Sequence, residues 1–154
     1  MIDRFKTIIS PAEAELKVSK SKFISQVFPV LNSEEVNQAL LLSRKKYYDA
    51  AHHPFAYRLG LDKNNFRYSD DGEPSGSAGK PIMEVIDKNE LTNVLLVVTR
   101  YFGGVKLGVG GLRRAIFDAS ELVVQTAKII TKQITENFLI EFDYKYIGAV
   151  MNFL

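Results

Sequence analysis

The chain has 154 residues, 46% of them hydrophobic and 25% charged, which is the composition of an ordinary soluble globular protein with one core. It contains no cysteine, and this excludes disulfides, zinc–thiolate sites and thiol catalysis. A net charge of +2 is too small to predict nucleic-acid binding by itself. The amino-terminal segment mixes charged and apolar residues and no long apolar run follows, so we expect a cytoplasmic protein without a membrane segment.

The first third of the chain predicts a strand pair followed by a helix. Residues 13–30 alternate like two strands around a polar turn at 19–22, and Pro29 ends the second strand. We interpret the lysines at 17, 20 and 22 as solvated hairpin charges, with a contact patch as the alternative. Ser33 is the expected N-cap of the helix, because acidic residues follow it and basic residues occupy the expected last turn.

A second strand signal, at residues 55–59, follows two adjacent histidines. His52 and His53 invite a metal-site interpretation, but neighbours on an extended chain point to opposite faces, so only one of them can serve a given site. We therefore expect no metal centre. A hydrogen-bonded, partly buried histidine at the strand entrance is the interpretation that we favour.

Residues 69–81, SDDGEPSGSAGKP, have the composition of a flexible loop ahead of a short helix at 82–86. The ending Gly79-Lys80 is not a phosphate-binding P-loop, because Pro74 and Pro81 occupy positions that need glycine and serine or threonine. The acids favour turn formation over catalysis. The loop residues that we expect to contact a partner are Asp70, Asp71, Ser75, Gly76, Ser77 and Gly79.

Residues 93–115 are the most distinctive stretch. A buried strand at 94–98 leads into nine residues, 103–111, that hold five of the ten glycines, and then into a helix with an apolar stripe from Leu112. We expect Arg113 and Arg114 in the first helical turn, where acids are usual, so a bound anion would resolve the conflict with the helix dipole. The alternative is a glycine turn with solvated arginines. The candidate anion- or nucleic-acid-binding residues are Arg58, Lys80, Arg100, Gly103, Gly104, Lys106, Gly110, Gly111, Arg113 and Arg114.

The last residues change in character. Residues 133–142 predict a strand and residues from 146 onward predict the start of a helix. Two such elements cannot bury their own apolar faces, so we expect either docking on the main domain or the beginning of a second small domain over 131–154.

Two long motifs resemble those of the IMPACT/YigZ family. They are residues 69–81 and residues 98–112, VTRYFGGVKLGVGGL, and the segment DAAHH at 49–53 is similar too. The resemblance covers roughly residues 13–130. The family usually has threonine where Ser77 stands and a small apolar residue where Arg113 stands, which weakens the interpretation of the doubled arginine as a family feature.

The resemblance implies an α+β fold for residues 1–130. It would be a two-layer α/β sandwich like the ribosomal-protein-like fourth domain of elongation factor G, with a left-handed βαβ unit. Residues 131–154 would match the first strand and helix of a ferredoxin-like domain. In eukaryotes the resemblance implies control of the amino-acid-starvation kinase through competition for its ribosome-associated activator, while bacterial members have no settled activity.

From the residues and the resemblance together we predict a non-enzymatic, translation-associated regulator without a cofactor. It would bind RNA, the ribosome or a ribosome-associated partner through the basic, glycine-rich edge. One alternative is an enzyme acting on a small phosphorylated molecule. That enzyme would need a pocket where Asp70, Asp71 and His52 or His53 converge with Arg100 or Lys106. The other is a protein-interaction module centred on exposed Tyr101 and Phe102.

Overall fold

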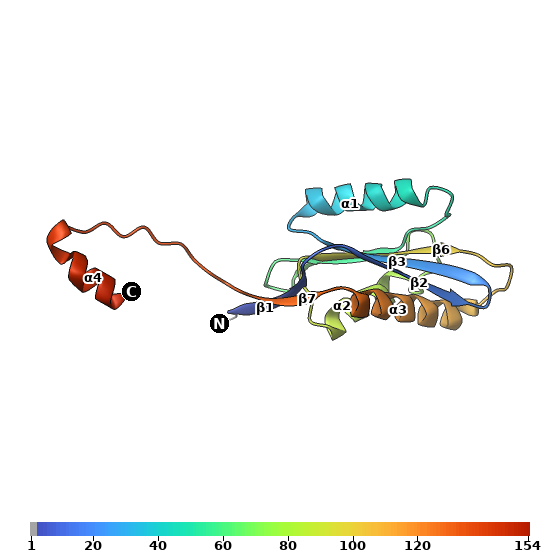
Figure 1. Cartoon of the computed structure of the whole chain (residues 1–154). Coiled ribbons are helices and arrows are strands. Elements are labelled where there is room, and N and C mark those ends of the chain that lie inside the picture. Colours follow the sequence, from blue (N-terminus) through green and yellow to red (C-terminus); the bar gives the residue numbers. More distant parts are fainter. Residues whose placement is uncertain (1–2) are drawn as a thin grey trace.

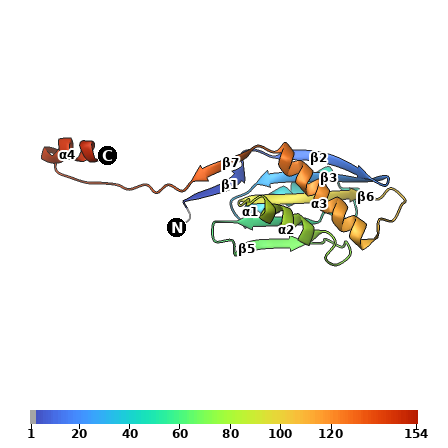
Figure 2. The ribbon, with the colours of Figure 1, turned by 90° about the horizontal axis from the view of Figure 1, so that it is seen from below.

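A five-stranded antiparallel sheet forms the centre of the computed structural model, which describes residues 3–154 (Figures 1 and 2). The strand order is β2-β3-β6-β4-β5. The bounds are β2 Ala12–Val18, β3 Ser21–Pro29, β4 Phe55–Leu59, β5 Asn65–Ser69 and β6 Val94–Tyr101. The expected β2–β3 hairpin is confirmed. Its turn residues, Ser19 and Lys20, have φ of 47° and 68°, the left-handed backbone that matches a two-residue hairpin turn to the strand twist.

Three helices cover the two faces of this sheet. Helix α1 (Ser33–Lys46) lies on one face, and α2 (Gly79–Lys88) and α3 (Gly108–Thr126) lie on the other (Figure 1). The expected α+β sandwich is confirmed, with α1 as an additional layer beyond the two that we expected. The extra layer follows from β6, whose apolar residues alternate between both faces and so need cover on each side.

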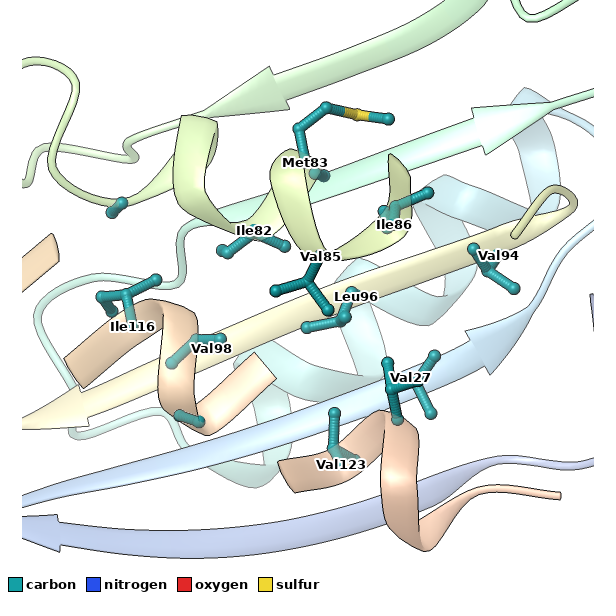
Figure 3. Packing of buried hydrophobic residues seen from close by; sticks show 14 of the residues in the cluster. Val27, Ile82, Met83, Val85, Ile86, Val94, Leu96, Val98, Ile116 and Val123 are labelled. Carbon is teal, nitrogen blue, oxygen red and sulfur yellow. The ribbon is translucent and has the colours of Figure 1, made fainter. Parts of the chain in front are cut away.

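The larger core lies between the sheet and the α2–α3 pair. Figure 3 shows Ile82 and Val85 of α2 and Ile116 of α3 pointing toward Leu96 and Val98 of β6, and each of these side chains is fully buried. The smaller core lies under α1. Because β6 contributes side chains to both cores, its position is fixed, and so is the starting point of the 102–107 loop that follows it.

Two helix starts differ from the expected ones. The N-cap of α1 is Asn32, whose side chain accepts a hydrogen bond from the Glu35 backbone N–H at 2.9 Å, and Ser33 is the first helical residue. Helix α3 begins at Gly108, so Arg113 and Arg114 lie in its second turn. The helix dipole acts mainly within the first turn, and the conflict that we inferred for these arginines is correspondingly weaker.

A two-stranded ribbon extends from one end of the sandwich (Figure 2). Strand β1 (Arg4–Ile8) pairs with β7 (Ile129–Gln133) in antiparallel register. The backbone N–H of Thr92 donates to the Lys6 carbonyl at 3.0 Å and joins the ribbon to the turn before β6. The prediction of a strand at 133–142 is wrong. Residues 134–143 are irregular, and the strand lies at 129–133, where it pairs with β1.

Residues 134–154 lie away from the sandwich in both ribbon views and contain a short 3-10 turn, η1 (Tyr144–Tyr146), and helix α4 (Ile147–Phe153). The side chains of this segment are largely exposed. Strand β7 crosses the expected boundary at 130/131, and the assignment of 131–154 to a second domain stays a prediction. Within residues 3–154, none of the helices has the length and apolar character needed to cross a membrane.

Candidate functional site

The two motif segments meet where β6 ends. The guanidinium of Arg100, near the end of β6, donates to both carboxylate oxygens of Glu73 in the 69–81 loop, at 2.7 and 2.8 Å. The Glu73 side chain is 1% exposed and the Arg100 side chain 20%. This fork-to-fork geometry is the strongest form of charge-assisted hydrogen bond, so the pair fastens the loop to the sheet.

The 69–81 loop is organised around Asp70. Its carboxylate accepts hydrogen bonds from the backbone N–H groups of Gly76, Ala78 and Gly79 at 3.0, 3.1 and 2.9 Å. Burial alone raises the pKa of Asp70, but the three N–H donors outweigh it and hold the pKa below its ordinary value. The loop is therefore tied down where we expected a flexible one. Ser77 and Gly79 are buried, whereas Ser75 remains exposed.

Asp71 joins this loop to the histidine corner. It accepts a hydrogen bond from the backbone N–H of His53 at 2.7 Å, and its carboxylate lies 3.5 Å from the guanidinium of Arg44 in α1. The His53 ring is 3.0 Å from the hydroxyl of Thr99, and burial lowers its pKa. His53 is 6% exposed, which agrees with the partly buried, hydrogen-bonded histidine that we favoured.

Each arginine of the predicted basic edge has an acidic partner within the chain. Arg58 pairs with Asp87, Arg113 with Glu84, and Arg114 with Asp118 four residues along α3. Arg113 also donates to the Gly76 carbonyl at 2.9 Å. The sequence between 92 and 117 holds no acid, but the fold supplies acids from elsewhere. Anion binding by these arginines stays a prediction. Their positive charges are already largely balanced by carboxylates of the chain, so an anion would have to compete with these ion pairs.

The predicted glycine cradle divides into structural and open positions. A Cβ on Gly103 would lie 1.9 Å from the carbonyl oxygen of Lys20, and the Gly103 N–H donates to the Ser21 hydroxyl at 3.2 Å. Gly103 therefore serves the packing of the 102–107 loop against the β2–β3 turn. Gly104 has φ of +88°, a left-handed conformation that favours glycine. Gly110 has a negative φ, and a Cβ there would meet open space, so neither conformation nor packing requires glycine at this position.

An exposed surface of mixed character results where this loop meets the hairpin turn. We call it the basic-apolar surface and define it by Lys20, Phe102, Val105, Lys106 and Val109. Phe102 is 57% exposed, Val105 43% and Val109 56%. Neither Lys20 nor Lys106 has a carboxylate partner within residues 3–154. A groove of about 400 Å³ runs along it, lined in part by Phe102, Lys106 and Val109.

Tyr101 and Phe102 behave differently although they are adjacent. The Tyr101 hydroxyl donates to Asp49 at 2.6 Å, and its ring packs edge-on against Tyr47. Burial together with the Asp49 hydrogen bond raises the pKa of Tyr101 to about 12. Tyr101 is thus half-buried and held in place, and of the two aromatics Phe102 is the one available for contact.

The convergence required by the enzyme alternative is partial. Asp71 and His53 come together, but the groove beside Arg100 and Lys106 is lined by neither of them, nor by Asp70 or His52. Among residues 3–154 no cluster of three or more histidine, aspartate or glutamate side chains is arranged to hold a metal ion. The acids and histidines of the motifs instead hold the loop, the sheet and α1 together.

Two residues that matter here were missed or undervalued in the sequence. Glu73 lies in the 69–81 motif, and its burial beside Arg100 has no local sequence signal because the two are 27 residues apart. Lys20 is exposed, as expected for a hairpin charge, and the contact of its backbone carbonyl with Gly103 has no local sequence signal. Lys80 is exposed at the start of α2, outside the basic-apolar surface.

Known proteins of one family resemble this chain. Its residues 19–124 match the Impact N-terminal domain. The IMPACT family member YvyE of Bacillus subtilis is 33% identical over 152 residues, which are 99% of this chain and 70% of that protein. The IMPACT family member YigZ of Escherichia coli is 34% identical over 108 residues, 69% of this chain and 53% of that protein.

A solved structure shares the fold. A crystal structure of a hypothetical protein superposes with a TM-score of 0.82 at 28% identity, over 86% of this chain and 66% of that one. The chain therefore spans between about half and two thirds of most of these proteins' own lengths.

Proposed function

The chain belongs to the IMPACT family, and on that basis we propose that it is a non-enzymatic, translation-related regulator that binds unpaired loops of ribosomal RNA through its basic-apolar surface. The observation that carries the proposal is exposed Phe102 beside unpartnered Lys106 along one groove, with a second unpartnered lysine, Lys20, in the hairpin turn that packs against Gly103 of the same loop. Proteins that bind unpaired RNA combine cations for the phosphates with aromatic faces for the bases.

The distribution of charge supports this surface over the remainder of the predicted edge. Arg58, Arg100 and Arg113 are engaged by carboxylates, so a phosphate would compete with an existing ion pair. Lys20 and Lys106 offer charge without that competition. The left-handed backbone at Lys20 and the close contact of Gly103 hold the two loops together, so little ordering is needed upon binding.

A protein partner of the ribosome is the second candidate, favoured by the three exposed apolar side chains Phe102, Val105 and Val109. Contiguous exposed apolar residues beside charges are typical of interaction sites. The two candidates differ in salt dependence, because release of counterions makes RNA affinity fall steeply with salt, while an apolar protein contact changes little.

The test is a salt titration of binding to purified ribosomal subunits and to a labelled ribosomal RNA hairpin. The variants are Lys20→Glu/Lys106→Glu and a matched control, Lys128→Glu/Lys132→Glu, whose exposed lysines lie at the ribbon end of the molecule. We expect the first variant to bind more weakly at every salt concentration and the control to bind like the wild type. Binding that is equal in all three proteins would overturn the proposed surface.

A further inference from the structure

A second cavity lies at the opposite end of the molecule, where the β1–β7 ribbon meets the sandwich. Its volume is about 540 Å³, and it is lined from five parts of the chain: β1, the end of β4, the β4–β5 loop, the end of α2 with the turn after it, and β7. Cavities of this size are typical of sites for small organic molecules. Phe5, Leu61 and Leu91 give it apolar walls, and Thr92 and Thr131 contribute polar groups.

The charges around this cavity do not cancel. Four cations line it, Arg4, Lys6, Arg58 and Lys63, against two acids. Lys6 pairs with Glu90 and Arg58 with Asp87, so both acids are used. Arg4 and Lys63 have no carboxylate partner within residues 3–154 and are exposed at the rim. The lining therefore carries an excess of two positive charges.

Arg58 is the unusual member of this set. Its side chain is 9% exposed, whereas its partner Asp87 is 54% exposed. Its Nε is buried and has no hydrogen-bond acceptor among the described residues. A buried cation balanced by one half-solvated acid keeps a positive potential in its surroundings, since the acid is screened by water on its other side. An anion in the cavity would lower the cost of burying this guanidinium.

We propose that this cavity binds a small organic phosphate, with the phosphate at Arg4 and Lys63 and the organic part against Leu61 and Leu91. A phosphate monoester carries about −1.5 to −2 charges at neutral pH, which matches the excess on the lining. Phosphate alone would leave most of the volume and all of the apolar wall without contact. The site is separate from the basic-apolar surface and its ligand is a small molecule rather than a polymer.

Such a ligand would also join the ribbon to the sandwich. Arg4 belongs to β1, while Lys63 belongs to the β4–β5 loop, so one phosphate touching both connects two parts of the molecule. At present the ribbon is held there by the Thr92–Lys6 backbone hydrogen bond and the Lys6–Glu90 ion pair. Ligand binding is therefore expected to slow hydrogen exchange in β1 and β7.

The experiment is calorimetric titration of the full chain with adenosine 5′-monophosphate as the probe, beside adenosine and inorganic phosphate. We expect the nucleotide to bind at least tenfold more tightly than either fragment. The variant Arg4→Gln/Lys63→Gln should weaken nucleotide binding by roughly tenfold or more, because it removes two charged donors. Leu61→Trp, which fills the apolar part, should abolish binding while the protein remains folded by circular dichroism.

Four results would overturn the proposal. One is the absence of nucleotide binding at millimolar concentration, and another is unchanged affinity in Arg4→Gln/Lys63→Gln. Equal affinity for inorganic phosphate and for the nucleotide would exclude a role for the apolar wall, and equal affinity for adenosine would exclude the anion site. The Lys20→Glu/Lys106→Glu variant should keep nucleotide binding, so failure of the RNA proposal and failure of this one are distinguishable.

Discussion

The Arg100–Glu73 pair should contribute more to stability than any other ion pair of the motif loop. Replacing Arg100 by methionine keeps most of the side-chain volume but leaves the Glu73 carboxylate, 1% exposed, without its partner. Removing one member of a buried pair costs about 3–5 kcal/mol, and we expect Arg100→Met to fall at the upper end of that range. Glu73→Gln should cost less, about 1–3 kcal/mol, because the Arg100 side chain is 20% exposed and still reaches water.

Urea denaturation of the wild type, both single variants and the double variant measures these free energies of unfolding, provided that the m-values agree. The double variant should be more stable than Arg100→Met alone, since it no longer contains a buried, unpaired carboxylate. If the free energy of unfolding of Arg100→Met lies within 1 kcal/mol of the wild-type value, the ion pair does not fasten the 69–81 loop to the sheet.

Three further predictions concern single residues of the same region. Gly103→Ala should destabilise the protein by about 1–3 kcal/mol because its Cβ would meet the Lys20 carbonyl at 1.9 Å, whereas Gly110→Ala, facing open space in a helix, should stabilise it by up to about 1 kcal/mol. Asp70→Asn should cost about 1–3 kcal/mol, since three backbone N–H groups lose a charged acceptor. Burial lowers the pKa of His53 below its ordinary 6.5, so the unfolded chain takes up the proton first. The free energy of unfolding therefore decreases as pH falls below about 6.5, and His53→Gln should remove this part of its pH dependence.

Thermal and urea denaturation check all three. Equal melting temperatures for the two alanine variants would contradict the close approach of Gly103 to the hairpin. An Asp70→Asn protein as stable as the wild type would show that the loop does not depend on that carboxylate. For His53, parallel stability curves of wild type and variant between pH 7 and pH 5 would rule out a neutral, buried imidazole.

The sequence predicts most of the elements whose apolar residues repeat with the period of a helix or a strand. Strand β6, the hairpin and the stripe of α3 were all recognisable because each has the periodicity of its own structure. The strand expected at 133–142 also alternates, but it has no neighbour to pair with, and the pairing at 129–133 depends on β1 more than 120 residues earlier. Alternation alone does not identify a strand when the partner is distant.

The candidate site was harder to predict because its contacts are set by topology. Arg113 and Glu84 are 29 residues apart, and no local pattern announces that the fold brings them together. The glycines are ambiguous for another physical reason. A position filled by neighbouring backbone, as at Gly103, and a position approached by a ligand both exclude a Cβ, so the sequence alone cannot separate them.

The salt dependence of RNA affinity for wild type and Lys20→Glu/Lys106→Glu measures how many phosphates the basic-apolar surface contacts. For single-stranded RNA each phosphate contact contributes about −0.7 to the slope of log K against log salt. We expect a slope about 1.4 units shallower in the variant, because two phosphate contacts are lost, and an unchanged slope in the Lys128→Glu/Lys132→Glu control. A slope that is the same in all three proteins, or affinity that does not respond to salt, would contradict RNA binding through the basic-apolar surface.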